Sequence, residues 1–250
     1  MIRILVLLSG VLIGLFAGAG GRAQPASDAV DCKVPQELLE DDPRMNALAQ
    51  RLRAKQPITV VAIGGASTAG TAGGSGESNS YPHRLEEALR KRHPGVTITV
   101  LNKGVPRQTT EEMIARFDRD VVPNAPALVI WETGTVDAVR GTDVDEFALA
   151  LAKGIAALRQ HNFDILLVNM QYNPSTASVI NFEPYLETLR RAADLEDVYL
   201  FRRFEIMRYW SETGIFDFVD VPKDRRTWLA GEVYRCLGDS VAEAIDFATQ

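Results

Sequence analysis

A glycine-rich bend in the first third of the chain carries two hydroxyl side chains. The stretch VVAIGGASTAG covers residues 60–70 and runs from an apolar, strand-like segment into Ser67 and Thr68. A serine hydroxyl becomes a useful nucleophile at neutral pH when a base lies within hydrogen-bond reach. Ser67 is therefore a candidate nucleophile. The alternative is that Ser67 and Thr68 make hydrogen bonds within a turn or contact a ligand.

The residues around this bend exclude two other kinds of glycine-rich loop. A P-loop needs a lysine that reaches the phosphates, and residues 56–84 contain none. The dinucleotide-binding motif needs Gly-x-Gly-x-x-Gly, and no register over residues 64–76 supplies it. The three histidines, His83, His93 and His161, are interpreted as surface or packing residues. No His, Cys, Asp or Glu cluster has metal-ligand spacing, so we expect neither a metal nor a cofactor.

The elements that must position this bend follow a regular pattern. Apolar, β-branched runs cover residues 57–63, 96–102, 126–132, 163–170 and 197–201. Helical periodicity covers residues 81–92, 110–121, 144–161, 184–194 and 226–247, and Asp42-Pro43 predicts a helix start that continues to Lys55. Strands and helices that alternate in this way predict a parallel sheet covered on both faces. The predicted fold is α/β, a doubly wound, flavodoxin-like three-layer sandwich with a five-stranded parallel sheet and a ligand crevice at the carboxyl ends of the strands.

Four blocks of the sequence resemble the SGNH/GDSL hydrolase family. VVAIGGASTAG is similar to the family's first block, a strand followed by Gly-Asp-Ser-x-Thr, and LNKGVPRQTTEEMIARFDRDV (101–121) resembles the second block. PALVIWETGTVDAVRG (126–141) resembles the Gly-x-Asn-Asp block, and VYRCLGDSVAEAI (233–245) resembles the helix that follows the Asp-x-x-His block. The blocks occur in order over residues 57–245, so the resemblance implies the family's fold.

The resemblance also implies a serine nucleophile, a histidine base oriented by an aspartate, and an oxyanion hole built partly from a glycine amide and an asparagine. The positions of the serine, glycine, asparagine, aspartate and histidine fall, in that order, on Ala66, Gly104, Val136, Arg225 and Trp228. Only the glycine is retained. The indole of Trp228 cannot accept a proton, and Val136 offers no hydrogen-bond donor to an oxyanion.

Two functional hypotheses follow from these departures. The first is an exported protein with the family's fold that lacks family-type ester hydrolysis and is retained for binding a glycan, an acylated polymer or a protein partner. The second is an SGNH-type esterase or acetylesterase that uses Ser67 as a displaced nucleophile with an unidentified base. The first hypothesis accounts together for all four missing catalytic side chains.

Two further segments are candidates for ligand contact. Gln171, Tyr172 and Asn173 follow the fourth predicted strand, and amides beside an aromatic ring suit a carbohydrate or another neutral polar ligand. A hydrogen-bonded loop is the alternative for these three residues. FRRFEIMRYW (201–210) interleaves arginines with aromatic residues, which suits a polymer-binding stripe or an amphipathic helix packed against the core.

The first 23 residues have the composition of a targeting segment. A basic start, the apolar run ILVLLSGVLIGLFAGAG and a small residue at position 23 predict a signal peptide, with an uncleaved membrane anchor as the alternative. We therefore expect a periplasmic or extracellular protein, with an arm and a helix over residues 24–56 and one domain over residues 57–250. The formal net charge of -6 argues against nucleic acid as a partner. Membrane contact is expected only through an uncleaved signal segment.

The chain has two cysteines, Cys32 and Cys236. In an exported protein an even number of cysteines predicts a disulfide, and two unpaired buried thiols are the alternative. A bridge requires the two Cα atoms to lie within about 7 Å of each other. Such a bridge would tie the amino-terminal arm to the predicted terminal helix.

Overall fold

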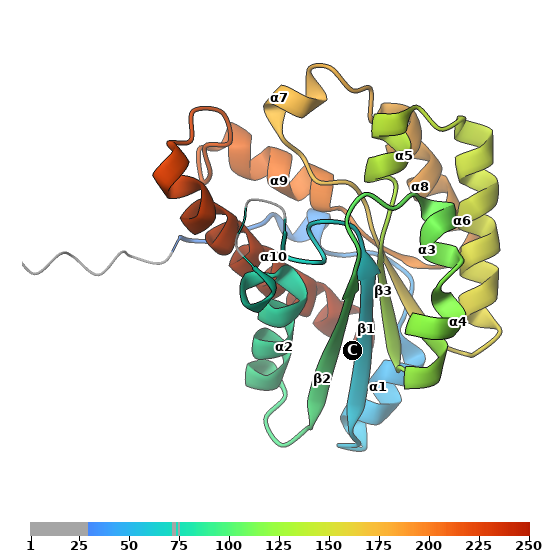
Figure 1. Cartoon of the computed structure of the whole chain (residues 1–250). Helices are drawn as coiled ribbons and strands as arrows, with labels where there is room; N and C mark the ends of the chain where they lie inside the picture. Colours follow the sequence, from blue (N-terminus) through green and yellow to red (C-terminus); the bar gives the residue numbers. More distant parts are fainter. Residues whose placement is uncertain (1–29, 72–73, 75) are drawn as a thin grey trace, which may run out of the picture.

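Five parallel strands form one sheet in the computed structural model, which describes residues 30–71, 74 and 76–250. The order across the sheet is β2-β1-β3-β4-β5. Figure 1 shows β1 between β2 and β3. The bounds are β1 (Ile58–Gly64), β2 (Ile98–Gly104), β3 (Leu128–Glu132), β4 (Asp164–Val168) and β5 (Tyr199–Phe201). Each strand lies within one or two residues of a predicted apolar run, so the predicted sheet is confirmed.

Helices cover both faces of this sheet. Alternate residues of each strand point to opposite sides, so both faces carry apolar side chains that must be buried. On β1, Val60 and Ala62 belong to one buried core, whereas Val61 and Ile63 belong to the other. The first core is covered by α1 (Asn46–Arg53), α2 (Tyr81–Arg92), α9 (Arg203–Glu212) and α10 (Arg226–Thr249). The second is covered by α3 (Thr110–Ile114), α4 (Phe117–Asp120), α6 (Val144–Arg159) and α8 (Glu183–Glu196). The doubly wound three-layer sandwich is therefore confirmed (Figure 1).

Short helices occupy several of the connections. Near the carboxyl ends of β3 and β4 lie α5 (Thr135–Arg140) and α7 (Pro174–Ala177). Single 3-10 turns cover Gln36–Leu38, Glu77–Asn79, Val122–Asn124 and Lys223–Arg225. No helix within the described ranges has both the length and the apolar character needed to cross a membrane. The predicted signal peptide lies outside the described residues.

Two predicted helices differ from those observed. The segment 110–121 was expected to be one helix, but it divides into α3 and α4 around Arg116. The Arg116 side chain turns inward, where its Nε donates to Gln108 at 2.7 Å and its Nη1 donates to Asp120 at 2.9 Å. The helix expected from Asp42-Pro43 begins only at Asn46, after the Met45 amide has donated to the carbonyl of Ala248 at 3.0 Å.

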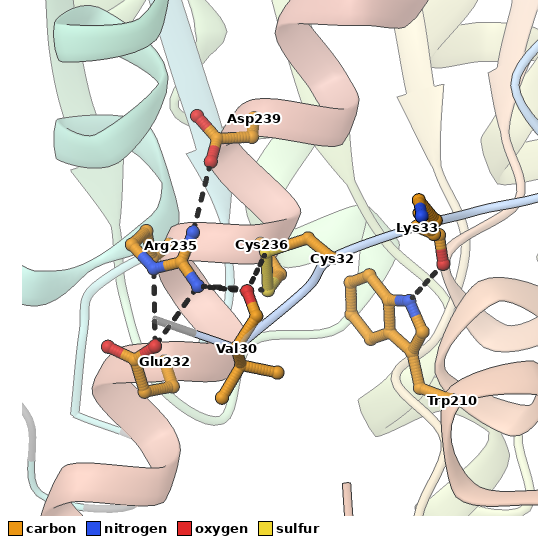
Figure 2. The surroundings of a disulfide bond; sticks show 8 residues. All are labelled: Val30, Cys32, Lys33, Trp210, Glu232, Arg235, Cys236 and Asp239. Atoms are coloured by element: carbon orange, nitrogen blue, oxygen red, sulfur yellow. Dashed lines mark hydrogen bonds and ion pairs between the residues drawn. A yellow bond between two sulfur atoms is a disulfide. The ribbon is translucent and has the colours of Figure 1, made fainter. Parts of the chain in front are cut away.

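Cys32 and Cys236 form a disulfide, as predicted, with a Cα–Cα distance of 5.2 Å and a sequence separation of 204 residues. Figure 2 shows the surroundings of this bond on the side of α10. The Arg235 guanidinium donates to the carbonyl of Val30 at 2.7 Å, and the Trp210 indole donates to the carbonyl of Lys33 at 3.2 Å. The arm is therefore held to α9 and α10 by hydrogen bonds from helix side chains to its backbone carbonyls, as well as by the covalent bond.

Two glycines of α10 provide a matched test of how closely this helix packs on α2. A Cβ added at Gly238 would lie 2.6 Å from the Cβ of Arg84 and 2.8 Å from the Leu85 nitrogen, whereas one added at Gly231 would meet nothing within 4 Å. We expect Gly238→Ala to lower the free energy of unfolding by about 1–3 kcal/mol through overpacking. Gly231→Ala should raise it by about 0.5–1 kcal/mol, because alanine favours a helix more than glycine does. Urea unfolding of both variants measures this difference, and equal effects would contradict the close packing.

Candidate functional site

A buried carboxylate stands at the carboxyl end of the central strand β3. Trp131 points into the core beneath α6, so the next residue, Glu132, points to the opposite face of the sheet. Its side chain is buried beside the glycine-rich bend at residues 65–70, the first loop, which follows β1. A Cβ at Gly64, the last residue of β1, would lie 2.8 Å from the Cβ of Glu132, so glycine is what leaves room for this carboxylate.

Arg203, the first residue of α9, forms an ion pair with Glu132 at 3.1 Å. The side-chain exposures are 1% for Arg203 and 5% for Glu132, so both charges are withdrawn from water. Buried charges of this kind occur in proteins when they are paired and hydrogen-bonded. The Nε of Arg203 has no partner among the described residues, so the pair is satisfied mainly through its terminal nitrogens.

The hydroxyls of the first loop complete this polar network. The Ser67 hydroxyl donates to Glu132 Oε2 at 2.7 Å and accepts from the Nη1 of Arg203 at 2.8 Å. The amide of Thr68 donates to the same carboxylate oxygen at 3.2 Å, and the Thr68 hydroxyl donates to it as well. Together these contacts anchor the glycine-rich bend to β3 and α9.

The charge state of Glu132 follows from its partners. Burial raises the pKa of the Glu132 carboxyl, but the Arg203 guanidinium and the hydroxyls of Thr68 and Ser67 outweigh burial and hold this pKa below its usual range. Burial and the negative charge of Glu132 raise the pKa of the phenols of Tyr81 and Tyr234. At neutral pH the centre therefore consists of a carboxylate, a guanidinium and neutral hydroxyl groups.

Ser67 is poorly placed to act as a nucleophile. It is 3% exposed, its proton is directed to Glu132, and its oxygen already accepts from Arg203. Glu132 is the acceptor of the Ser67 proton, and a carboxylate with a lowered pKa is a weak base. The arrangement stabilises the loop and gives this hydroxyl an acceptor that is too weakly basic to activate it for nucleophilic attack.

Gly104 lies against the same loop, as its family position implies. In the β1–β2 register Gly104 is the partner of Gly64, and a Cβ at Gly104 would overlap the backbone of Ala69. The backbone amide of Gly104 donates to the side-chain oxygen of Asn102 at 2.9 Å. The side-chain nitrogen of Asn102 donates to the carbonyl of Thr68 at 2.7 Å. The amide of the oxyanion glycine is thus engaged in a hydrogen bond within its own strand.

The remaining family positions have other surroundings. Ala66 is half-buried, and its carbonyl accepts from the Thr71 amide at 3.0 Å. Val136 is half-buried on α5. Arg225 stacks over the ring of Trp228 at 4.7 Å, and Trp228 is 42% exposed. These two residues line a cavity together with Val30, Ile215 and Phe216, and none of Ala66, Ser67, Gly104 and Val136 lines it.

Asp137 joins two short helices. Its carboxylate accepts from the Thr110 amide at 3.1 Å and from the Thr110 hydroxyl at 2.9 Å, which joins the start of α3 to α5. Burial raises the pKa of the Asp137 carboxyl, and the hydrogen bonds from Thr110 oppose this shift. Asp137 therefore has a structural role in this part of the fold.

The three histidines interact away from this centre. His83 lies 3.7 Å from Glu87 within α2, and His93 lies 3.0 Å from Asp246 of α10. The ring of His161 stacks on Phe163 at 5.3 Å. None of these contacts involves the first loop.

Gln171, Tyr172 and Asn173 line a cavity of about 390 Å³ that also includes one face of α10. The Asn173 oxygen caps α7 by accepting from the amides of Ser175 and Thr176. The Tyr172 ring packs edge-on against Phe204 at 5.1 Å. Tyr172 and Asn173 therefore each make a structural contact and also line the cavity.

Sequence reasoning missed Glu132 and Arg203 as members of the central network. In the sequence, Glu132 stands at the end of a predicted apolar strand, and Arg203 is one of several arginines in a segment with helical spacing. The available signal was a single carboxylate directly after LVIW, because a charged residue at the end of a fully buried strand needs a partner. The structure confirms the helical interpretation of the segment around Arg203 and gives that side chain a buried ionic role.

Comparison with solved structures places the fold among SGNH/GDSL hydrolases. A lipolytic protein of the G-D-S-L family from Desulfitobacterium hafniense DCB-2 is 20% identical, with a TM-score of 0.56 over 75% of this chain and 99% of that chain. A catalytic mutant of the acetylxylan esterase Axe2 from Geobacillus stearothermophilus is 21% identical, with a TM-score of 0.57 over 76% of this chain and 94% of that chain. AlinE4, an SGNH-hydrolase family esterase, is 26% identical, with a TM-score of 0.54 over 66% of this chain and 86% of that chain.

The sheet order, the placement of the first loop and these similarities define a protein with the SGNH/GDSL hydrolase fold. A sequence model of the Non-GDSL lipase-like family matches residues 31–250. The chain therefore belongs to the Non-GDSL lipase-like family. No curated protein matches its sequence.

Proposed function

We propose that this protein is exported and binds its target without family-type ester hydrolysis. Its target in this proposal is a glycan, an acylated polymer or a protein partner. Export is supported by the apolar segment before Ala23 and by the disulfide, since disulfides persist mainly in oxidising compartments. The similarity to an acetylxylan esterase supports a polysaccharide or its acyl groups as the class of target.

The observation that carries this proposal is the state of Ser67. Its hydroxyl is buried and is hydrogen-bonded to both members of the Glu132–Arg203 pair. A hydrolase of this fold needs a serine that reaches the substrate and a base that accepts its proton. Val136 and Trp228, at the asparagine and histidine positions, add neither an oxyanion donor nor a base.

Active-site labelling tests the proposal without knowledge of the target. Protein lacking residues 1–23 is expected to react with a fluorophosphonate no more than its Ser67→Ala variant does, because the probe requires an activated serine. Mass spectrometry of the intact protein measures the labelled fraction, with an active serine esterase as the positive control. Ala66→Ser alone should also remain unlabelled, because the base would still be missing.

Stoichiometric labelling that Ser67→Ala abolishes would overturn the proposal. It would establish the alternative, an esterase or acetylesterase with Ser67 as a displaced nucleophile. Turnover of short-chain aryl esters above the Ser67→Ala control would have the same meaning.

A further inference from the structure

The groove between α6 and α8 is an apolar surface on the outside of the molecule. These two helices pack side by side on the face of the sheet opposite α2 and α10 (Figure 1). The groove has a volume of about 360 Å³, and its walls include Val144, Ala148, Ala152, Ala192 and Leu195. Its floor and walls therefore offer mostly small apolar side chains to a partner.

Two large apolar side chains extend into water on this surface. Leu195 lines the groove and is 78% exposed, and Leu149, which lies three residues before Ala152 on α6, is 72% exposed. No other leucine within the described ranges is exposed. Exposed apolar side chains that gather beside one groove indicate an interaction surface, whereas single ones scattered over a protein do not.

The outer face of α6 is complementary to a second copy of itself that runs in the opposite direction. Asp145, Ala148, Ala152, Ala156 and Arg159 recur at spacings of three and four residues, so they share one face, and each is exposed or half-buried. The pattern is symmetric about the central alanine, with an alanine and then a charge at equal distances on either side. In an antiparallel pair, Asp145 of each copy therefore faces Arg159 of the other copy.

The two charges are available for this contact. In the described part of the chain, Asp145 takes part in no ion pair. Arg159 forms an exposed ion pair with Glu196 at 2.9 Å through Nη1. Because a guanidinium has five N–H donors, Arg159 can bind a second carboxylate while it keeps the first.

We propose that two copies of this protein associate through this face, with α6 of each copy antiparallel to α6 of the other and the exposed leucines buried between them. A two-fold axis beside Ala152 makes the interface isologous, which is the commonest arrangement in homo-oligomers. The small side chains at its centre allow the two helices to approach closely. The inference does not depend on the proposed binding function, because neither Ser67 nor Glu132 lines the groove.

Sedimentation equilibrium of the protein that lacks residues 1–23 measures this association. A dimer is expected, with a dissociation constant below about 100 μM. Leu149→Arg should raise this constant at least about tenfold, because it replaces a buried apolar contact with an unpaired charge in the interface. The matched control is Val219→Arg, at a valine that is 59% exposed and lies beside α10, and it should leave the constant unchanged.

Exchange of the two charges tests the antiparallel pairing. Asp145→Lys and Arg159→Glu should each raise the dissociation constant at least about threefold, because like charges then face each other at both ends of the interface. An equimolar mixture of these two variants should associate as the wild type does. In the mixed dimer the substituted side chains have opposite charges at one end, and the native Asp145 and Arg159 meet at the other.

Three results would overturn the proposal. The first is a wild type that remains monomeric at about 100 μM, which would leave the groove to a partner of another kind. The second is a mixture of the charge variants that associates no better than either variant alone. The third is undiminished dimerisation of Leu149→Arg, since the two copies would then meet through another surface.

Discussion

Replacing Glu132 with glutamine is expected to lower the free energy of unfolding by about 3–5 kcal/mol, because it leaves a buried guanidinium without its counter-charge. The ion pair with Arg203 is almost fully withdrawn from water, and Ser67 and Thr68 both donate to the same carboxylate. Chemical denaturation monitored by circular dichroism measures the loss. A loss below about 1 kcal/mol would contradict the buried pair.

A double-mutant cycle separates the ion pair from general loss of packing. Glu132→Met with Arg203→Met removes both charges, so the double variant should lose clearly less stability than the two single variants together. The surface pair Arg159–Glu196, with side-chain exposures of 43% and 37%, provides the matched control. Glu196→Gln should cost no more than about 1 kcal/mol.

The same pair predicts a pH dependence with a definite sign. The pKa of Glu132 in the folded protein lies below its ordinary value of 4.5 because of Arg203 and the hydroxyl donors. The stability that this shift contributes is present above about pH 4.5 and is lost as the pH falls through the lower folded-state pKa. The difference in stability between the wild type and Glu132→Gln should therefore shrink as the pH is lowered below 4.5.

Removing the disulfide should lower the free energy of unfolding by a similar amount. The chain-entropy model gives a stabilisation of about 5 kcal/mol for a bridge that closes a loop this long, and measured losses for native disulfides are roughly 2–5 kcal/mol. We expect Cys32→Ala with Cys236→Ala to lower the unfolding free energy within that range, because the two residues are 204 positions apart in the sequence. Urea unfolding of the double variant measures it.

The oxidised wild type in the same buffer is the reference for this measurement, and the wild type treated with a reductant is a second control. Reduction and substitution should lower the free energy of unfolding equally if the covalent link is the source of the stabilisation. Unchanged stability in both would show that the contacts of Arg235 and Trp210 with the arm already hold it in place.

The sheet was predictable because its strands carry a local signal. Runs such as ITVVAI and LVIW are apolar throughout, which is typical of strands that are buried on both faces. The disulfide was predictable from the two cysteines together with the expected export. The division of residues 110–121 into two helices was not predictable, because it depends on contacts that the inward side chain of Arg116 makes in the folded protein.

The central network was not predictable for a different reason. Glu132 and Arg203 are 71 residues apart: Glu132 ends β3, and Arg203 begins α9 just after β5, a strand that β4 separates from β3 in the sheet. Matching the sequence to the family's motifs places Ser67 next to the nucleophile position. It gives no information about the ion pair between Glu132 and Arg203. From the sequence, the resemblance to the family led only to the expectation that the usual base and oxyanion donor are missing.

The position of α10 in the chain also affects how the protein is made. This helix follows all five strands in the sequence, yet its residues Val233, Leu237 and Val241 belong to the same core as Val60 of β1. While a ribosome is still translating residues 58–225, that face of the sheet has no α10 to cover it. The nascent chain exposes this apolar surface until residues 226–249 emerge, so the unfinished chain is a natural client for chaperones.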